Sequence, residues 1–149
     1  MLFNLYHDYL IQKGVKADHL IEIALDDIMN DELREPKTLY NHIKGRIVDN
    51  EQYYLFLDEI QFVGDFSDLV NGLSHIRNLD VYVTGSNSKF LSSDIITEFR
   101  GRGDEIRMYP LSFSEYFSVA NTTFDRAWND YILYGGMPLI LSQKITAQL

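Results

Sequence analysis

Cysteine is absent from the 149 residues, and proline occurs only three times. Without cysteine the chain forms neither a disulfide framework nor a cysteine-ligated metal site, and we expect a reducing, cytoplasmic location. Long hydrophobic runs are also missing. The longest apolar stretch, residues 131–141, is too short to span a bilayer and is interrupted by two glycines and a proline. The first ten residues lack a basic region and contain Asp8, so we expect neither a signal peptide nor a membrane partner.

Positive charge is scarce. Lysine and arginine total 13 against 22 aspartates and glutamates, which gives a formal net charge of −9. Nonspecific nucleic-acid binding needs lysine and arginine to neutralise phosphates, so we expect no nucleic-acid partner, although a local basic patch is not excluded. The histidines are not spaced as metal ligands are, and we expect core or surface roles for them: His7, His19, His42 and His75.

The most informative stretch that is present is YYLFLDEIQ, residues 53–61. Its first five residues form an unbroken apolar and aromatic run that is too short for an ordinary helix, which indicates a strand buried on both faces. Two carboxylates, Asp58 and Glu59, follow at the carboxyl end of this strand. Ligands bind at that edge in open α/β sheets. The pattern is that of a Walker B strand, but an acidic pair that merely opens a solvated loop remains the alternative.

The remaining apolar patterns alternate between strands and helices. Three further strands are predicted at residues 19–25, 80–84 and 105–109. Helices are predicted at the start of the chain, ending near Gly14, and around residues 36–47, 66–76, 91–99, 112–117 and 128–132. Their expected end signals are Pro36 at a first helical position, Asp65 as a cap, a capping box from Ser112 to Glu115, and Gly135–Gly136 as a break. Such alternation predicts an α/β fold with a parallel sheet and right-handed crossovers.

Four phrases, in this order, resemble the AAA-type ATPases of bacteria and archaea that often carry a C-terminal domain of unknown function. They are LFLDEIQ, VTGSNSKFLSSDI, GRGDEIRMYPLSFSEYF and YGGMP, and they cover most of residues 53–138. The resemblance implies a three-layer, P-loop NTPase-like fold and a function in ATP binding and hydrolysis with magnesium. Residues 1–118 would form a partial ATPase core, and residues 119–149 the start of a helical C-terminal region.

Carried over to this sequence, the resemblance implies a role for each polar residue at the strand ends. Asp58 would hold the magnesium ion and Glu59 would polarise the attacking water. Ser86, or Asn87 beside it, would take the sensor position, although Ser86 is also an ordinary turn residue. Arg102, or Arg100, would act as an arginine finger. An arginine there also interacts favourably with a helix C-terminus, so that alternative stays open.

One element of the resemblance is missing. No G-x-x-x-x-G-K-[ST] segment occurs in these residues, although the first helix should directly follow such a Walker A loop. Each charge-assisted hydrogen bond to phosphate contributes roughly 1.5–3 kcal/mol, so losing about four of them is comparable to the binding energy of a micromolar ligand. We therefore expect an N-terminally truncated fragment or degraded copy that binds ATP feebly and is inactive alone.

The resemblance also implies that the strand before the missing loop would lie between residues 81–84 and 105–109. We therefore expect three strands to hold together and residues 105–109 to be detached or paired elsewhere.

Two other functions remain open. The same chain could be a non-catalytic remnant that survives as a protein-interaction module, with self-association as one outcome, because its abundant tyrosine and phenylalanine suit an interface. A metal-dependent phosphohydrolase that uses Asp58 and Glu59 directly is less favoured, because adjacent carboxylates on a strand point in different directions.

Overall fold

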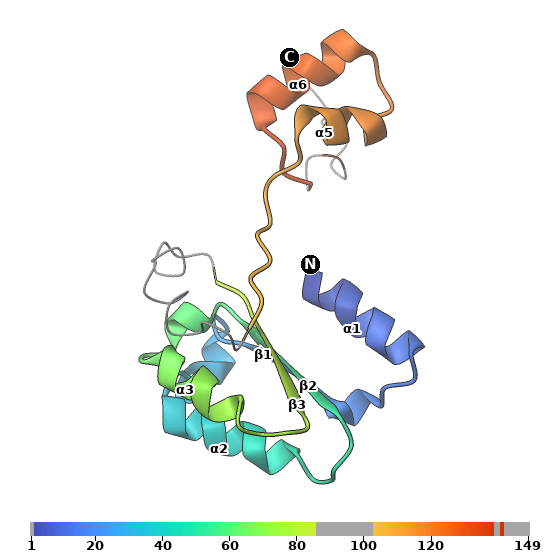
Figure 1. Cartoon of the computed structure of the whole chain (residues 1–149). Helices are drawn as coiled ribbons and strands as arrows, with labels where there is room; N and C mark the ends of the chain where they lie inside the picture. Colours follow the sequence, from blue (N-terminus) through green and yellow to red (C-terminus); the bar gives the residue numbers. More distant parts are fainter. Residues whose placement is uncertain (1, 86–102, 139–140, 142–149) are drawn as a thin grey trace. The chain divides into compact units, whose positions relative to one another are not determined.

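The computed structural model describes residues 2–85, 103–138 and 141, and these fall into two compact units, Met1–Gly103 and Asp104–Leu149. The first unit contains an open parallel sheet in the order β1-β2-β3 (Figure 1). Its strands are β1 (Leu20–Ala24), β2 (Tyr53–Asp58) and β3 (Leu79–Val83). The expected three-stranded parallel unit is thereby confirmed, within one residue at most strand ends.

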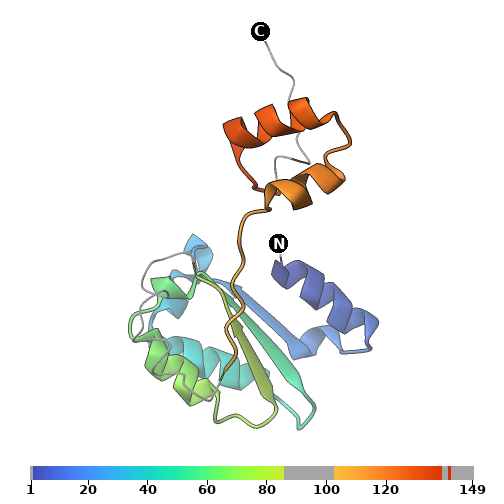
Figure 2. The ribbon, with the colours of Figure 1, turned by 45° about the horizontal axis from the view of Figure 1, so that its top comes forward.

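The sheet is covered on both faces, which makes a three-layer α/β arrangement. The alternation of side chains along β2 decides which residues meet which layer. Leu55 and Leu57 belong to a core with Leu39 and Leu69, which come from α2 (Pro36–Arg46) and α3 (Phe66–Leu73). Phe56, on the other face, packs in a second cluster with residues of α1 (Leu2–Gln12), as Figure 2 shows by the opposite positions of α1 and the α2–α3 layer. This is an α/β fold, consistent with an incomplete P-loop NTPase-like sheet.

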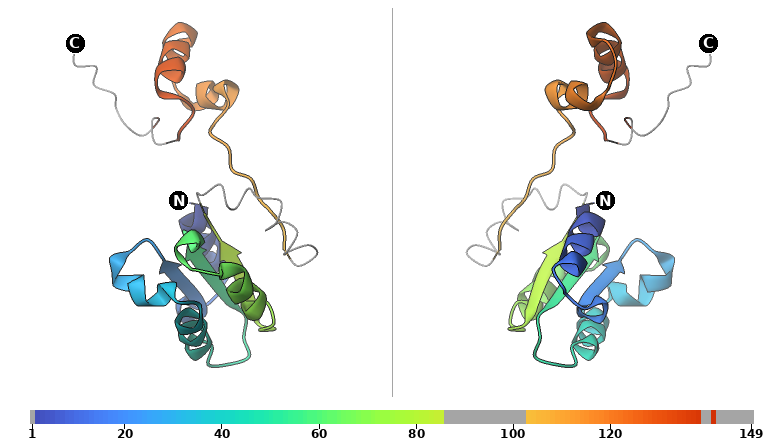
Figure 3. Two further views of the ribbon diagram at one scale, coloured as in Figure 1. Left: turned by 90° about the vertical axis from the view of Figure 1, so that its left-hand side faces the viewer. Right: turned by 90° about the vertical axis from the view of Figure 1, so that its right-hand side faces the viewer.

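The short 3-10 helices connect these elements at the ends of the sheet. They are η1 (Ala17–His19), η2 (Ile28–Arg34) and η3 (Ile60–Phe62). Figure 3 shows η2, in light blue, on the β1 side of the sheet, away from β3.

Several predicted helix ends are confirmed at atomic level. Gly14 has φ +91° and closes α1, with Val15 N–H donating to Leu10 O at 3.1 Å and Gly14 N–H donating to Ile11 O at 2.9 Å. This pair of bonds is a Schellman motif, which requires a left-handed residue. Pro36 starts α2, and Glu35 caps it by accepting from Thr38 N–H at 2.6 Å.

Two sequence-based predictions are wrong. Asp65 does precede α3, but it has φ +47° and its side chain makes no capping bond, because a left-handed turn brings the chain into the helix. Residues 105–109 form no strand. A strand needs a neighbour, and among the described residues none pairs with this segment; Arg107 instead bonds locally to Glu105, Nε to Oε1 at 2.8 Å.

The second unit is a helical hairpin of α5 (Phe113–Val119) and α6 (Phe124–Tyr134). The predicted capping box is present: Ser112 Oγ accepts from Glu115 N–H, while Ser112 N–H donates to the Glu115 carboxylate at 2.8 Å. The Ser112 hydroxyl also donates to the Glu115 carboxylate at 2.7 Å, and this bond, together with that from the Ser112 N–H, lowers the pKa of Glu115. Gly135 ends α6 with φ +78°, which confirms the predicted break.

The predicted domain boundary at residue 118 stays a prediction. None of the helices in the described ranges has the length and apolar character needed to cross a membrane.

Candidate functional site

The carboxyl ends of the three strands meet at one edge of the first unit. Leu57 of β2 is in register with Val83 of β3, and Asp58 with Ala24 of β1. Asp58 is the last residue of β2, and Glu59 follows it directly. The predicted position of the acidic pair, beside the end of the third strand, is therefore confirmed. Its catalytic role is a separate question.

Thr84, the residue after β3, connects to both members of the acidic pair. Its hydroxyl donates to Asp58 Oδ1 and accepts from Glu59 N–H at 3.2 Å. The backbones are joined on either side, because Thr84 N–H donates to Leu57 O at 2.9 Å and Ile60 N–H donates to Thr84 O at 3.0 Å. All three polar residues of this contact are half-buried. One Asp58 oxygen is thus held in a defined direction by a neighbouring strand.

Glu59 adopts an unusual backbone conformation. Its φ of 55° and ψ of 50° lie in the left-handed region, which costs a non-glycine residue about 1–3 kcal/mol. The turn takes the chain out of the strand direction immediately after Asp58 and into η3. Gln61 in η3 donates its side-chain N–H to Glu59 Oε2. Glu59 is therefore held at its backbone N–H by Thr84 and at its carboxylate by Gln61. Strained backbone conformations of this kind cluster at functional sites.

The loop after β1 is tied to the same edge. Leu25 N–H donates to Asp58 O at 3.1 Å. Arg34 of η2 donates from Nε to Leu25 O at 2.8 Å, and its guanidinium lies 5.0 Å from the centre of the Phe62 ring in η3. Arg34 therefore links the segments that follow β1 and β2, and it supports the site through backbone contacts.

The donor set at this edge fits magnesium. Mg²⁺ takes oxygen ligands and is usually held by one or two carboxylates together with waters and substrate phosphates. Asp58, the last residue of β2, supplies such a carboxylate. The described part of the chain contributes no Walker A lysine or phosphate loop, and no such motif occurs in the printed sequence.

Ser86, Asn87, Arg100 and Arg102 lie outside the described residues, so their predicted roles stay predictions. Thr84 was missed as a site residue. The sequence shows it only as the last position of a predicted strand, and its two polar partners lie about 25 residues earlier in the chain.

Comparisons with known proteins agree with the resemblance. A family described as an AAA domain matches residues 1–117. An uncharacterized protein of Haemophilus influenzae is 31% identical over 147 residues, which covers 95% of this chain and 37% of that protein. An uncharacterized protein of Methanocaldococcus jannaschii is also 31% identical over 147 residues, which covers 91% of this chain and 31% of that protein.

The chain thus spans little more than a third of the length of the first relative and less than a third of the second. No solved structure is significantly similar to it. The family match, over more than half of the chain, agrees with the parallel sheet and with the acidic pair at its carboxyl edge. The chain belongs to the AAA domain family of ATPases.

Proposed function

We propose that the edge formed by Asp58, Glu59 and Thr84 is the Walker B half of a magnesium-dependent ATPase site. The observation that supports this most strongly is the pairing of a buried parallel strand with two carboxylates at its end, braced by the neighbouring strand. Asp58 would hold the ion through its carboxylate, and Glu59 would accept a proton from the attacking water. Magnesium, when bound with ATP, supplies the charge that neutralises the transferred phosphoryl group.

The remaining roles follow the family pattern. Ser86 or Asn87 aligns the attacking water, and Arg102 or Arg100 stabilises charge on the phosphoryl group, in its own site or in that of a neighbouring copy. The 149 residues hold no phosphate loop, so in our proposal they act as a fragment or degraded copy that does not turn over ATP alone.

Inactivity of the isolated chain is tested by measuring phosphate release and ATP binding with magnesium. We expect no turnover, and we expect Asp58→Asn and Glu59→Gln to leave the result unchanged. Robust turnover that Glu59→Gln abolishes would show that these residues are sufficient, and it would overturn this part of the proposal.

The role of Asp58 is tested in a chain extended at its amino end by a strand and a G-x-x-x-x-G-K-[ST] loop. Asp58→Asn should weaken ATP binding in the presence of magnesium and leave the magnesium-free binding unchanged. Glu22→Gln, an exposed carboxylate in the middle of β1, is the matched control and should have no effect. An equal response of both variants would contradict the magnesium role of Asp58.

A protein-interaction role is the second candidate, and one observation favours it. Among the described residues, β3 pairs with β2 alone, so its other side has unpaired backbone groups. Such an edge is a template for another strand. Stable self-association of the isolated chain without nucleotide, measured by analytical ultracentrifugation, would support this candidate. A monomer at all accessible concentrations would contradict it.

A further inference from the structure

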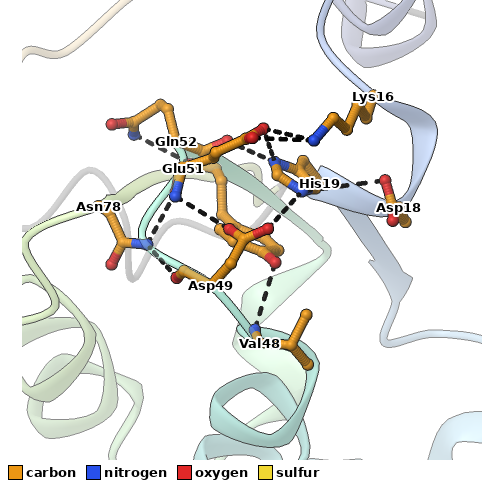
Figure 4. Close-up of polar contacts among 9 residues, drawn as sticks. Lys16, Asp18, His19, Val48, Asp49, Glu51, Gln52 and Asn78 are labelled. Carbon is orange, nitrogen blue, oxygen red and sulfur yellow. Dashed lines mark hydrogen bonds and ion pairs between the residues drawn. The ribbon is translucent and has the colours of Figure 1, made fainter.

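The opposite end of the sheet carries a second polar cluster, separate from the acidic pair. His19 ends η1, just before β1, while Asp49 and Glu51 lie in the segment that leads into β2 (Figure 4). Strand β2 runs from Tyr53 to Asp58, and five steps of about 3.3 Å place its two ends about 17 Å apart. The cluster therefore shares no residue with the candidate ATPase edge.

The His19 imidazole is held in one orientation. It is only 3% exposed and is stacked on the Tyr53 ring, with 4.2 Å between ring centres and 13° between planes. Its Nδ1 lies 3.3 Å from the carbonyl oxygen of Gln52. A carbonyl oxygen accepts only, so Nδ1 carries the proton in this contact and donates it. In the neutral ring this tautomer leaves a lone pair on Nε2.

Nε2 faces carboxylates. It lies 3.4 Å from Asp49 Oδ2 and 3.9 Å from Asp18 Oδ1, while Glu51 Oε2 lies 3.8 Å from Nδ1. The 3.4 Å separation between Nε2 and Asp49 Oδ2 is an ion-pair distance, similar to the 3.3 Å of the Nδ1 contact. In the neutral ring this lone pair would repel the ionised carboxylates, and a positive charge at Nε2, whether a proton or a bound cation, removes the repulsion. The imidazole is buried and stacked, so it cannot turn away.

The Asp49 carboxylate and the backbone of the segment before β2 are held in position before any ion binds. Glu51 N–H donates to Asp49 Oδ1 at 2.9 Å. Asn78 Nδ2 donates to the carbonyl oxygens of Asp49 at 3.1 Å and of Glu51 at 2.8 Å, as drawn in Figure 4. One ligand atom each from His19, Asp49 and Glu51 lie within 4.8 Å of one another, an arrangement that no other group of three such residues in the described ranges shows.

We propose that His19, Asp49 and Glu51 form a binding site for a divalent transition-metal cation of the zinc class. One imidazole nitrogen with carboxylate oxygens is a ligand set that zinc accepts, whereas magnesium and calcium prefer oxygen alone. The Nδ1–H bond to the Gln52 carbonyl is the outer contact that orients a metal-ligating histidine. A bound cation would join η1 to the segment before β2 and thereby stabilise the first unit.

Lys16 competes for the same carboxylate. Its Nζ lies 2.8 Å from Glu51 Oε2 and donates a hydrogen bond to Glu51 Oε1 at 2.9 Å. Both side chains of the pair are more than half exposed. Exposed ion pairs are weak, so a divalent cation can displace the lysine. Removal of the ammonium should therefore strengthen metal binding.

The test is isothermal titration of the full 149-residue chain with zinc chloride, together with thermal unfolding in zinc and in magnesium at equal concentration. We expect one zinc per chain and a higher melting temperature in zinc than in magnesium. Asp49→Asn and Glu51→Gln, which alter partly exposed side chains, should each lower the zinc affinity about tenfold or more. His19→Asn should abolish this binding, and Lys16→Gln should increase the affinity.

His42→Asn and His75→Asn, which change exposed histidines elsewhere, are the controls and should bind zinc like the parent chain. The proposal is overturned if the parent chain shows no saturable zinc binding, if magnesium raises the melting temperature equally, or if the control variants lose as much affinity as Asp49→Asn. If His19→Asn does not fold, the two carboxylate variants and Lys16→Gln still decide the matter. These readouts are independent of ATP, so failure here leaves the proposed ATPase role untouched.

Discussion

Thr84 braces the acidic pair with a single hydroxyl group. It donates to the Asp58 carboxylate and accepts from the Glu59 backbone N–H, so one side chain compensates two half-buried polar groups. The backbone of Glu59 is left-handed, and the Thr84 hydroxyl is the acceptor for its N–H in that conformation. The hydroxyl thus contributes to the geometry of the site as well as to the stability of the sheet edge.

Replacement of Thr84 by valine tests this contribution. Valine keeps the shape but leaves an N–H donor and a carboxylate oxygen without this partner, which should lower the free energy of unfolding by about 1–3 kcal/mol. Urea denaturation followed by circular dichroism measures the loss. Thr38→Val, which removes an exposed hydroxyl bonded to Glu35, is the control and should cost less. Equal losses for the two valine variants would contradict the bracing role of Thr84.

Sequence patterns predicted the helix ends well where the interactions that form them are local. Gly14, Pro36 and the Ser112–Glu115 box follow from backbone rules that act within one helical turn, and the structure confirms each. The left-handed turn at Asp65 was missed, since aspartate caps helices more often than it takes a positive φ. The partners of Thr84 and His19 were missed because they come from segments far apart in the chain.

Hydrogen bonds join the start of α5 to the end of α6 and so close the helical hairpin. Leu111 N–H donates to Gly136 O at 2.7 Å, and the Tyr131 hydroxyl donates to Leu111 O at 2.8 Å. The Phe113 ring packs between the helices, 4.7 Å from the Trp128 ring centre and 5.4 Å from that of Tyr131. The hairpin thus combines an aromatic core with a backbone closure.

Gly136 is required for this closure. A Cβ atom at position 136 would lie 2.0 Å from Leu111 O, so an alanine forces the backbone apart. Gly136→Ala should therefore destabilise the hairpin by about 1–3 kcal/mol, the usual cost of overpacking. Near-ultraviolet circular dichroism of the aromatic residues during thermal unfolding reports the loss.

Gly45→Ala is a suitable comparison, because a Cβ there meets nothing within 4 Å. Alanine favours the α2 helix by about 1 kcal/mol, so this variant should be neutral or stabilising. An unchanged aromatic signal and melting temperature in Gly136→Ala would contradict the close approach of Leu111 and Gly136.

For the first unit as a whole, the three-stranded parallel sheet was predictable, but the assignment of a fourth strand was wrong. Alternating apolar runs gave three strands that pair in parallel as expected. Residues 105–109 have the residue types of a strand. A strand also needs a neighbouring strand to pair with, and the sequence of the segment does not show whether one is present. The expectation that this segment would not join the three-stranded unit is confirmed among the described residues, while its assignment as a strand is wrong.

Hydrogen exchange provides a test of this organisation in solution. Amides that donate across the β1–β2 and β2–β3 pairings should be strongly protected, because they are hydrogen-bonded within a sheet that helices cover on both faces. Amides of residues 105–109 should exchange quickly, since they make no strand pairing. Mass spectrometry of peptic fragments resolves the two regions. Equal, strong protection of all four segments in a monomer would contradict the three-stranded unit.

Asp58 and Glu59 are proposed as the catalytic half of an ATPase site, and the phosphate release rate of the P-loop-extended chain tests this proposal. Phosphate release from the extended chain should require magnesium. In Glu59→Gln that release should fall to background while ATP binding is retained, because the base that polarises water is lost and the binding contacts are not. Glu22→Gln should keep the parent rate. Undiminished phosphate release in the Glu59→Gln chain would contradict the account.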